Sequence, residues 1–264
     1  MTNEHGDAGR PVALVMAATK GLGRGAAVAL AESGHNLVLC ARSEEELQAS
    51  RVDLEEYGGG VETVRADVSK LPDIEAVFKR ADDVFGRLDV LVVNAGGPPP
   101  GAFLGVTDDQ WEVAFQLTLM SAVRAMRLAV DRMRGNRFGR IVVIGSSSVK
   151  APIPSLALSN AFRPALHGCV KTLSREVAAD GITVNIVSPG RIDTDRVRSL
   201  DESRAKTLGI STSEARAESE KSIPAGRYGE PGELGSLVNF LASARAGYIT
   251  GQSILVDGGM VSAL

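Results

Sequence analysis

A serine-rich turn and the helix expected after it carry the side chains best suited to chemistry. Residues 141–176 read as an apolar strand, the turn Ser146-Ser147-Ser148 and a long helix with Ser159 and Arg163. Hydroxyl groups can donate to a substrate oxygen, and a guanidinium keeps a permanent positive charge on a fork of donors. This set can stabilise developing negative charge, but neither group exchanges a proton readily near neutral pH.

A glycine-containing turn near the start of the chain predicts a phosphate site. Residues 17–25, AATKGLGRG, follow a short apolar run and precede a segment with helical spacing. Glycines at such a junction let the backbone approach a pyrophosphate, whose charge then lies at the helix N-terminus. By itself, Gly21-Leu22-Gly23 is equally compatible with a tight strand-to-helix turn.

Apolar runs that alternate with helical patterns predict the elements that must position these residues. We expect strands at residues 11–17, 36–41, 61–66, 88–94, 140–145, 182–187 and 253–256, and helices at 22–32, after Ser43, at 74–85, 109–133, after the serine-rich turn and at 231–242. Near-continuous β-branched strands separated by helices are typical of a parallel sheet covered on both faces. The predicted fold class is α/β, a doubly wound parallel sheet of the Rossmann type in a single domain.

Two segments differ from that pattern. Residues 1–10 are polar and are predicted to form a disordered tail, which leaves residues 11–264 for the domain. Residues 195–222 are rich in Arg, Glu, Ser and Asp and lack an apolar stripe sufficient for a core helix. A long polar insertion beside a binding crevice is typical of a substrate lid.

Composition argues against several classes of protein. The 264 residues, with 44% hydrophobic and 23% charged residues, suit one large globular domain. A net charge of −3 does not indicate a surface that binds nucleic acid. The start of the chain lacks the apolar stretch of a signal peptide, and no run is expected to cross a membrane. Cys40 and Cys169 lie in apolar surroundings, which favours reduced thiols in a cytoplasmic protein, and no metal-ligand cluster is expected.

Several motifs in order resemble those of the short-chain dehydrogenase/reductase family, in particular its 3-oxoacyl-ACP reductase-like members. They are Asp67-Val68, Asn94-Ala95-Gly96, PGRIDT at residues 189–194, and GRYGEPGEL and YITGQSILVDGG near the end. The resemblance covers residues 11–260 and implies an oxidoreductase that transfers a hydride between NADP(H) and a carbonyl or secondary alcohol. In the family's glycine motif, Met16 and Ala17 stand where Thr and the first Gly are usual, and an alanine there disfavours positive φ.

The resemblance also implies cofactor roles. Asp67 and Val68 would meet the adenine, residues 94–96 would lie near the ribose, and Ile192 and Thr194 would approach the nicotinamide carboxamide. No carboxylate ends the second strand, so Lys20 and Arg42 are predicted to hold a 2′-phosphate, which favours NADP(H) over NAD(H). The full predicted set is Ala17, Thr19, Lys20, Gly21, Leu22, Gly23, Arg42, Asp67, Val68, Asn94, Ala95, Gly96, Arg163, Pro189, Gly190, Ile192 and Thr194.

The catalytic positions implied by the resemblance carry unusual residues. Where the family has Asn, Ser, Tyr and Lys, this chain has Thr118, Ser146, Ser159 and Arg163, although neighbouring serines leave the register of Ser146 open. A phenol of pKa ~10 can be brought toward neutrality, whereas a serine hydroxyl is a far weaker acid with a shorter reach. Arg163 can bind ribose hydroxyls but cannot shuttle protons.

Three functions are compatible with these residues. The first is an NADP(H)-dependent oxidoreductase with a non-standard tetrad. The second is a non-redox lyase, isomerase or cyclase that stabilises an enolate, because the tyrosine is lost and a cation is kept. The third is a catalytically inactive dinucleotide-binding module, which Ala17 leaves open. We expect a small-molecule substrate and, from the resemblance, a homo-oligomer, either a dimer or a tetramer.

Other polar residues near the predicted crevice have simpler explanations. Packing is favoured for His167, and solvent exposure for Lys150 and Asp193. The arginines at 191, 196 and 198 could meet an anionic substrate such as a carboxylate. Because aspartates lie among them, an ordinary mixed-charge surface is the favoured interpretation.

Overall fold

The computed structural model describes residues 9–263. The tail predicted at residues 1–10 falls mainly on residues 1–8, which lie outside the described residues. Residues 9 and 10 lead through a turn and bend into the first strand.

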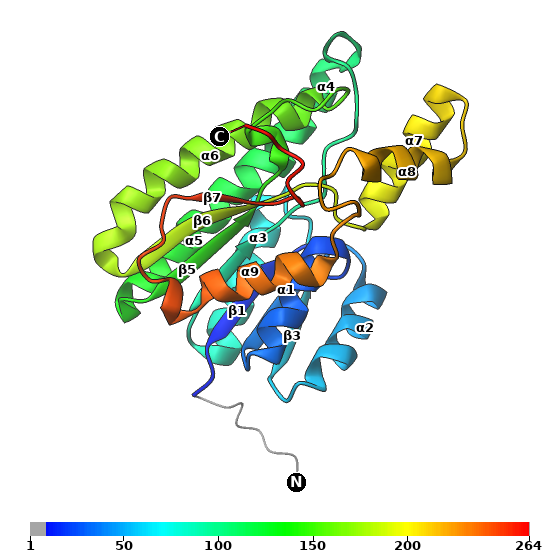
Figure 1. The fold of residues 1–264 in the computed structure, drawn as a ribbon. Helices are drawn as coiled ribbons and strands as arrows, with labels where there is room; N and C mark the ends of the chain where they lie inside the picture. The colour runs from blue at the N-terminus through cyan, green and yellow to red at the C-terminus, as the bar shows by residue number, and fades with distance from the viewer. Residues whose placement is uncertain (1–8, 264) are drawn as a thin grey trace.

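A parallel sheet of seven strands forms the centre of the domain, in the order β3-β2-β1-β4-β5-β6-β7 (Figure 1). The strands are β1 (Val12–Met16), β2 (Asn36–Ala41), β3 (Val61–Arg65), β4 (Val90–Val93), β5 (Gly139–Ile144), β6 (Ile182–Pro189) and β7 (Ser253–Val256). Each predicted strand is present, with ends shifted by at most one or two residues. All of β1, β2, β4 and β5 is buried, as their near-continuous apolar sequences require.

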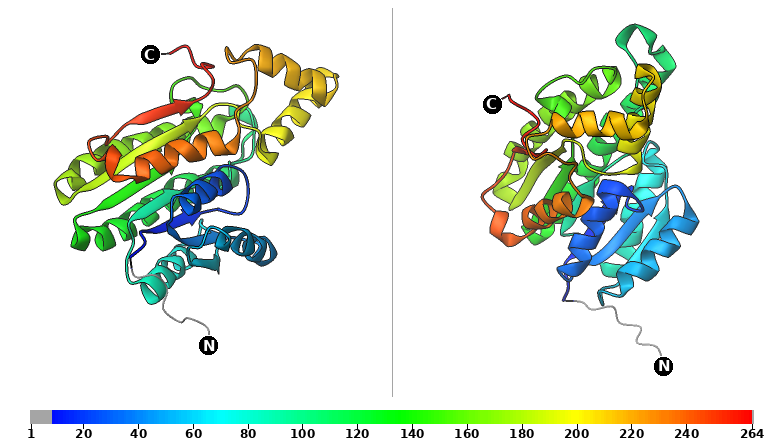
Figure 2. Two further views of the ribbon diagram at one scale, coloured as in Figure 1. Left: turned by 60° about the horizontal axis from the view of Figure 1, so that its bottom comes forward. Right: turned by 45° about the vertical axis from the view of Figure 1, so that its right-hand side comes forward.

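Helices cover both faces of the sheet, which confirms the doubly wound prediction (Figure 2). One face packs against α1 (Gly21–Glu32), α2 (Glu44–Glu55) and α9 (Pro231–Ala242), and the other against α3 (Leu71–Phe85), α5 (Ser121–Met133) and α6 (Ala157–Val177). Within β1, Ala13 and Val15 point to the first face while Leu14 and Met16 point to the second. This alternation divides the apolar residues into two cores.

The helix predicted at residues 109–133 is interrupted. The chain forms α4 (Asp108–Ala114), a π-helical turn at Phe115–Met120, labelled η2, and then α5. In η2 the Leu117 carbonyl accepts a hydrogen bond of 2.5 Å from the Ser121 hydroxyl. A π turn adds a single residue to one helical turn, and the apolar pattern of one sequence did not reveal this local change of register. Such turns are frequent at functional sites.

The same stretch corrects the expectation that no run is long enough to cross a membrane. Asp108–Asn136 is 29 residues long with an apolar window of mean hydropathy 1.3, which suffices by length and composition. However, 44% of that window is buried inside the protein, and α5 packs against α3, β4 and β5. We therefore interpret it as a helix of the second core.

The polar insertion forms two helices, α7 (Asp195–Leu208) and α8 (Thr212–Lys221), which project beyond the carboxyl ends of the strands (Figure 1). Thr194 caps α7 by accepting from the amide of Val197, and Ser211 with Glu214 forms a capping box for α8. The residues that the pair buries include polar ones, Asp201 and Ser219. Capping and polar contacts thus replace the missing apolar stripe.

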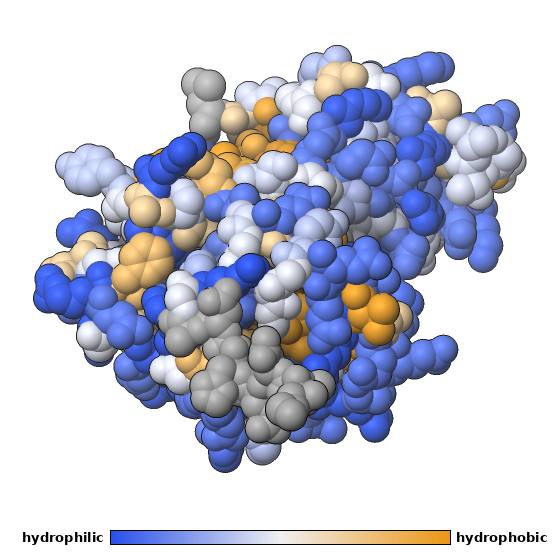
Figure 3. All heavy atoms as spheres, turned by 90° about the horizontal axis from the view of Figure 1, so that it is seen from below, coloured by the Kyte–Doolittle hydropathy of each residue, from blue (hydrophilic) through white to orange (hydrophobic). Residues whose placement is uncertain are grey.

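The face seen from below, at the amino ends of the first strands, is mainly hydrophilic, with hydrophobic residues in small separate groups (Figure 3). Large apolar side chains such as Phe78 and Met133 are instead fully buried. This face therefore offers no large apolar surface for a ligand, and we expect the functional site at the carboxyl ends of the strands.

The turn after β1 stores backbone strain that a single substitution should relieve. Ala17 has a φ of 48°, in the left-handed region, which costs an alanine about 1–2 kcal/mol. Glycine avoids that cost but adds freedom to the unfolded chain, which costs about 0.4–1 kcal/mol. We expect Ala17→Gly to raise the free energy of unfolding by about 0.5–1 kcal/mol, measured by urea denaturation.

The matched control is Ala18→Gly. Ala18 is fully buried and is not among the residues with positive φ, so this change should lower stability by about 1 kcal/mol. A destabilised Ala17→Gly variant would contradict the strain that the backbone implies.

Candidate active site

A cleft of about 990 Å³ lies at the edge of the sheet where the strands end. Its walls include the residues that directly follow β1 to β6 and the start of α7. The strand order reverses between β1 and β4, and the cleft lies at that reversal, the usual place for a ligand in an open α/β sheet.

Most of the predicted site residues line this one cleft. They are Ala17, Thr19, Lys20, Gly21, Leu22, Arg42, Asp67, Val68, Asn94, Ala95, Gly96, Ser146, Ser159, Arg163, Pro189, Gly190, Ile192 and Thr194. Two predicted residues, Gly23 and Thr118, do not line it.

Gly23 does not line the cleft, but it allows a close contact between the segments that do. A Cβ at this position would lie 2.2 Å from the Ala17 carbonyl oxygen and 2.7 Å from Nδ2 of Asn94. The Asn94 amide donates to the same Ala17 carbonyl at 3.1 Å. Gly23 is thus required so that α1 can approach the ends of β1 and β4, which builds a cradle for an anion at the start of α1.

One carboxylate that the sequence analysis missed lies at the end of the cleft near β2. Glu46 forms an ion pair of 2.7 Å with Lys20 and accepts from the Thr19 hydroxyl at 3.0 Å. These two contacts hold the pKa of the Glu46 carboxyl below its usual range. Lys20 is therefore not a free cation, and any anion bound here competes with Glu46.

Arg42 lies at the same end of the cleft without such a partner. Within residues 9–263 the Arg42 side chain forms no ion pair. Its backbone carbonyl accepts a hydrogen bond from Nε of Arg65. The sequence signal for Glu46 was its position at the start of α2, but that position also suited a helix cap. Only the folded chain brings it against Lys20.

The three serines after β5 have different surroundings. Ser146 and Ser147 line the cleft, and the Ser146 hydroxyl accepts from the amide of Ser148 at 3.1 Å. The hydroxyl nearest to that of Ser159 belongs to Ser148, at 3.4 Å. The Ser159 hydroxyl, which lines the cleft, is therefore paired with a second buried hydroxyl rather than with a titratable group.

Arg163 is a buried cation for which the described residues provide no counter-ion. Its side chain is 9% exposed, Nη1 donates to the Ile144 carbonyl at 2.6 Å, and Nε has no hydrogen-bond partner among the described residues. Burial lowers the pKa of the guanidinium to about 10, so it remains charged at neutral pH. An uncompensated charge and a hydrogen-bond donor without a partner at the wall of a cleft indicate that a bound ligand supplies the hydrogen-bond acceptor.

Thr118 lies one layer behind the cleft. It is buried on the π turn, its hydroxyl has no hydrogen-bond partner within residues 9–263, and its neighbour Leu117 lines the cleft instead. The unsatisfied hydroxyls and donors of this region are thus Thr118 Oγ1 and Arg163 Nε, both at positions that the sequence analysis assigned to catalysis.

The remaining candidates are resolved by their contacts. Neither His167, Lys150 nor Asp193 lines the cleft. His167 is partly buried on α6, where burial and the charges of Lys150 and Lys171 lower its pKa. Asp193 forms ion pairs with Arg198 and Arg216. His167 is thus partly packed and Lys150 is exposed, as predicted, whereas Asp193 is not the solvent-exposed residue that was predicted, because two arginines cover it.

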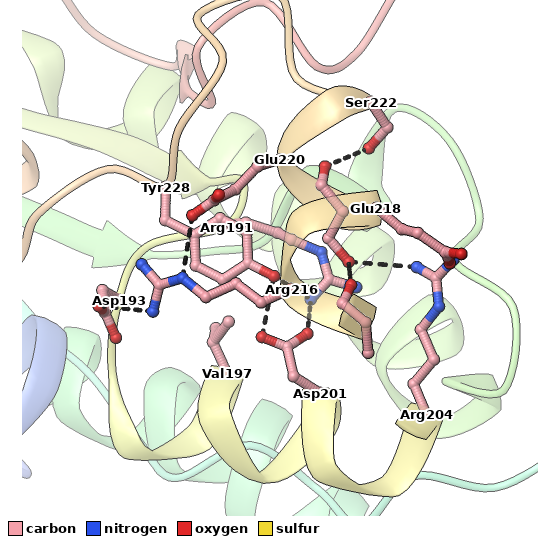
Figure 4. Close-up of polar contacts among 12 residues, drawn as sticks. Arg191, Asp193, Val197, Asp201, Arg204, Arg216, Glu218, Glu220, Ser222 and Tyr228 are labelled. Carbon is pink, nitrogen blue, oxygen red and sulfur yellow. Dashed lines mark hydrogen bonds and ion pairs between the residues drawn. The ribbon is translucent and has the colours of Figure 1, made fainter. Parts of the chain in front are cut away.

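A network of charged residues holds α7 and α8 against the domain (Figure 4). Asp201 is 2% exposed and receives Nη1 of Arg191 at 2.6 Å and the Tyr228 hydroxyl at 2.8 Å. The guanidinium of Arg216 lies over the Tyr228 ring at 4.6 Å. Because a buried carboxylate is stable only when paired, Asp201 determines where α7 lies.

The sequence analysis also missed the apolar wall of the cleft. Its residues share no motif and come from the segment before α6, from α7 and from the C-terminal segment: Ile153, Pro154, Leu156, Leu200 and Met260. The run APIP at residues 151–154 was the available signal, since an exposed apolar turn between two elements often faces a ligand.

Comparison with known proteins gives close relatives across the whole chain. The family model described as enoyl-(acyl carrier protein) reductase matches residues 16–261. The 3-oxoacyl-[acyl-carrier-protein] reductases FabG of Vibrio cholerae and Escherichia coli are 37% and 36% identical over 250 residues, 94% of this chain and 96% of each relative.

Solved structures agree. An actinorhodin polyketide ketoreductase with NADPH has a TM-score of 0.93 and 33% identity, covering 97% of this chain and 99% of its own. The L-sorbose reductase of Gluconobacter frateurii, complexed with NADPH and L-sorbose, has a TM-score of 0.92 and 31% identity, covering 97% and 98%. YwfH, an NADPH-dependent reductase involved in bacilysin biosynthesis, has a TM-score of 0.92 and 30% identity, covering 97% and 100%.

The unpaired charge of Arg163 should reduce the stability of the ligand-free protein. Replacing it with methionine removes a buried cation while keeping an apolar stem, at the loss of one hydrogen bond to Ile144. We expect Arg163→Met to raise the free energy of unfolding by about 1–2 kcal/mol, measured by urea denaturation without ligand. Arg175→Met, at an exposed position of the same helix, should change it by less than about 0.5 kcal/mol. A loss of stability in Arg163→Met would show that the charge is compensated.

Proposed function

The chain belongs to the short-chain dehydrogenase/reductase family, and from that premise we propose that it is an oxidoreductase that transfers a hydride between NADP(H) and a carbonyl or secondary alcohol. The observation that carries this proposal is the single cleft that unites the cofactor motif residues with Ser146, Ser159 and Arg163. Three solved relatives are described as NADPH-dependent or as NADPH complexes, which supports the choice of cofactor.

The residues present fit a dinucleotide. The start of α1, with Ala17 and Gly21 in left-handed conformations, offers its amides to the pyrophosphate. Asp67 and Val68 would hold the adenine, Asn94 and neighbouring residues the ribose, and Ile192 with Thr194 the nicotinamide. When bound, the cofactor supplies or accepts the hydride.

Arg42 and Lys20 would bind the 2′-phosphate. The two side chains reach the same end of the cleft, where Glu46 holds Lys20 until a phosphate takes its place. Because Arg42 has no ion pair in the part of the chain that the structure describes, it would supply most of the attraction, and a planar guanidinium is well suited to phosphate.

The proposed tetrad is Thr118, Ser146, Ser159 and Arg163. Ser146 would donate to the substrate oxygen, and Arg163, through Nε and its remaining donors, would hold the nicotinamide ribose and stabilise negative charge on that oxygen. The proton would pass through Ser159 or an ordered water, since serine is a poor acid. A missing acid can cost ~10²- to 10⁴-fold in rate, so turnover should be slow unless the substrate suits this site.

We further propose a cytoplasmic homo-oligomer, a dimer or a tetramer. Its support is the family relationship, together with exposed apolar residues before α4 and before β7, such as Leu104 and Tyr248.

Consumption of NADPH tests the main proposal. Purified protein should oxidise NADPH with members of a carbonyl panel that includes 3-oxoacyl thioesters, followed by absorbance. Ser146→Ala should lower kcat/KM by about 10- to 1,000-fold, because one donor to the developing charge is lost.

The double variant Ser159→Tyr with Arg163→Lys distinguishes the alternatives. Activity in the native protein supports the proposal. Activity only in the double variant would show that the native site is not a reductase, and product formation without NADPH consumption would favour a lyase, isomerase or cyclase. NADPH binding without turnover in either protein would favour an inactive binding module.

Cofactor preference rests on Arg42. We expect Arg42→Ala to weaken NADPH binding by about 10- to 100-fold, while NADH binding changes little, because only NADPH carries the 2′-phosphate. Calorimetric titration measures both. Arg51→Ala, which removes an exposed arginine that pairs with Glu55 on α2, should leave both affinities unchanged. An equal loss for NADH and NADPH would contradict a 2′-phosphate role.

A further inference from the structure

Arginines of the lid region differ in whether a carboxylate neutralises them. The paired ones are Arg191 with Asp201, Arg198 with Asp193, Arg204 with Glu218 and Arg216 with Glu220, and Figure 4 shows three of the four pairs. Among the arginines of residues 190–222, all of which the structure describes, Arg196 is the one without an ion pair. The mixed-charge explanation therefore accounts for its neighbours but not for Arg196.

Arg196 lines the cleft at the first turn of α7. Its Nη2 donates to the Pro98 carbonyl at 2.6 Å, and its Nε would lie 3.2 Å from a Cβ placed on Gly97. Burial lowers the pKa of its guanidinium, and no nearby acid offsets this effect. The Pro98 carbonyl satisfies one hydrogen-bond donor of Arg196 but carries no charge. The positive charge of the guanidinium is therefore not neutralised by this contact.

The wall that Arg196 reaches is rigid and apolar. The loop after β4 is joined to the segment before α6, because Gly101 donates to Ser155 at 2.7 Å and Ala157 donates to Gly101 at 3.1 Å. Apolar residues of this loop, of the segment before α6 and of α7 line the cleft: Pro98, Ile153, Pro154, Leu156, Val197 and Leu200. Asp195 at the start of α7 also belongs to the lining, and it pairs with Arg198. The chamber formed here thus combines an apolar wall with the guanidinium of Arg196.

Arg196 comes from a different part of the chain than the residues proposed for the 2′-phosphate. Lys20 and Arg42 follow β1 and β2, whereas Arg196 is two residues after Thr194, which is proposed to meet the nicotinamide. Given the proposed function, on which this step rests, the chamber beside Arg196 is where a substrate would lie.

We infer that Arg196 binds a carboxylate of the substrate, so that the substrates are oxo acids or hydroxy acids with an apolar chain. A single guanidinium with one donor already used suits a monoanionic carboxylate. A dianionic phosphate would need further free cations, and the neighbouring Arg191 and Arg204 already have carboxylate partners. Arg196 is thus a specificity-determining residue.

Binding of non-reacting probes tests this inference without turnover. Hexanoate and hexanamide have the same chain but differ in charge, and each is titrated into the full-length protein saturated with NADP⁺, with ligand-observed NMR as the readout. We expect hexanoate to bind at least about tenfold more tightly than hexanamide to the native protein, and Arg196→Gln to abolish that preference.

Arg198→Gln provides the matched control, since Arg198 is exposed, paired with Asp193 and absent from the cleft lining. It should keep the preference for hexanoate. Equal binding of the two probes to the native protein, or a preference that survives in Arg196→Gln, would overturn the inference. So would a loss of NADP⁺ affinity in Arg196→Gln with the probe preference intact, because Arg196 would then serve the cofactor. A protein that prefers hexanoate but never consumes NADPH keeps this inference and loses the proposed reaction.

Discussion

All strands of the sheet run in the same direction, and this constraint brings the chemistry of the chain to one edge. Parallel strands end together, so residues separated by more than a hundred positions become neighbours at the carboxyl ends of β1, β4, β5 and β6. The contact of Asn94 with the Ala17 carbonyl, and the absence of a side chain at Gly23, draw two of those ends to the start of α1. The cleft follows from this convergence.

At the centre of the cleft, permanent charge replaces titratable groups. Arg163 keeps its charge at neutral pH although burial lowers its pKa, and the serines around it are much weaker acids than a tyrosine. The site is therefore better suited to holding and stabilising an anion than to delivering a proton. A buried, unsatisfied guanidinium reduces stability in the absence of ligand, which is a cost that functional sites commonly carry.

The helices α7 and α8 are held in place by charged contacts as well, but here each buried charge has a partner. Asp201 is buried between Arg191 and Tyr228, so its charge is satisfied and α7 is fixed in place. A helix pair with little apolar surface can remain in position only through such contacts. Because the other arginines are neutralised, Arg196 is left as the uncompensated charge on this side of the cleft.

The sequence by itself determined the fold class, the strands and the order of the motifs, because burial on both faces of a parallel sheet imposes a pattern that each segment shows locally. Through the family resemblance, it also predicted Ser159 and Arg163 as site residues, and both line the cleft. Tertiary structure alone decided which charges are paired. Lys20 meets Glu46, and Arg191 meets Asp201, while Arg163 and Arg196 meet no carboxylate within residues 9–263. The π turn at Thr118 was likewise invisible to periodicity. The reason is physical: hydrophobic patterning is a property of neighbouring residues in the chain, whereas the partner of a charge is set by distances of a few ångströms between segments that only folding brings together.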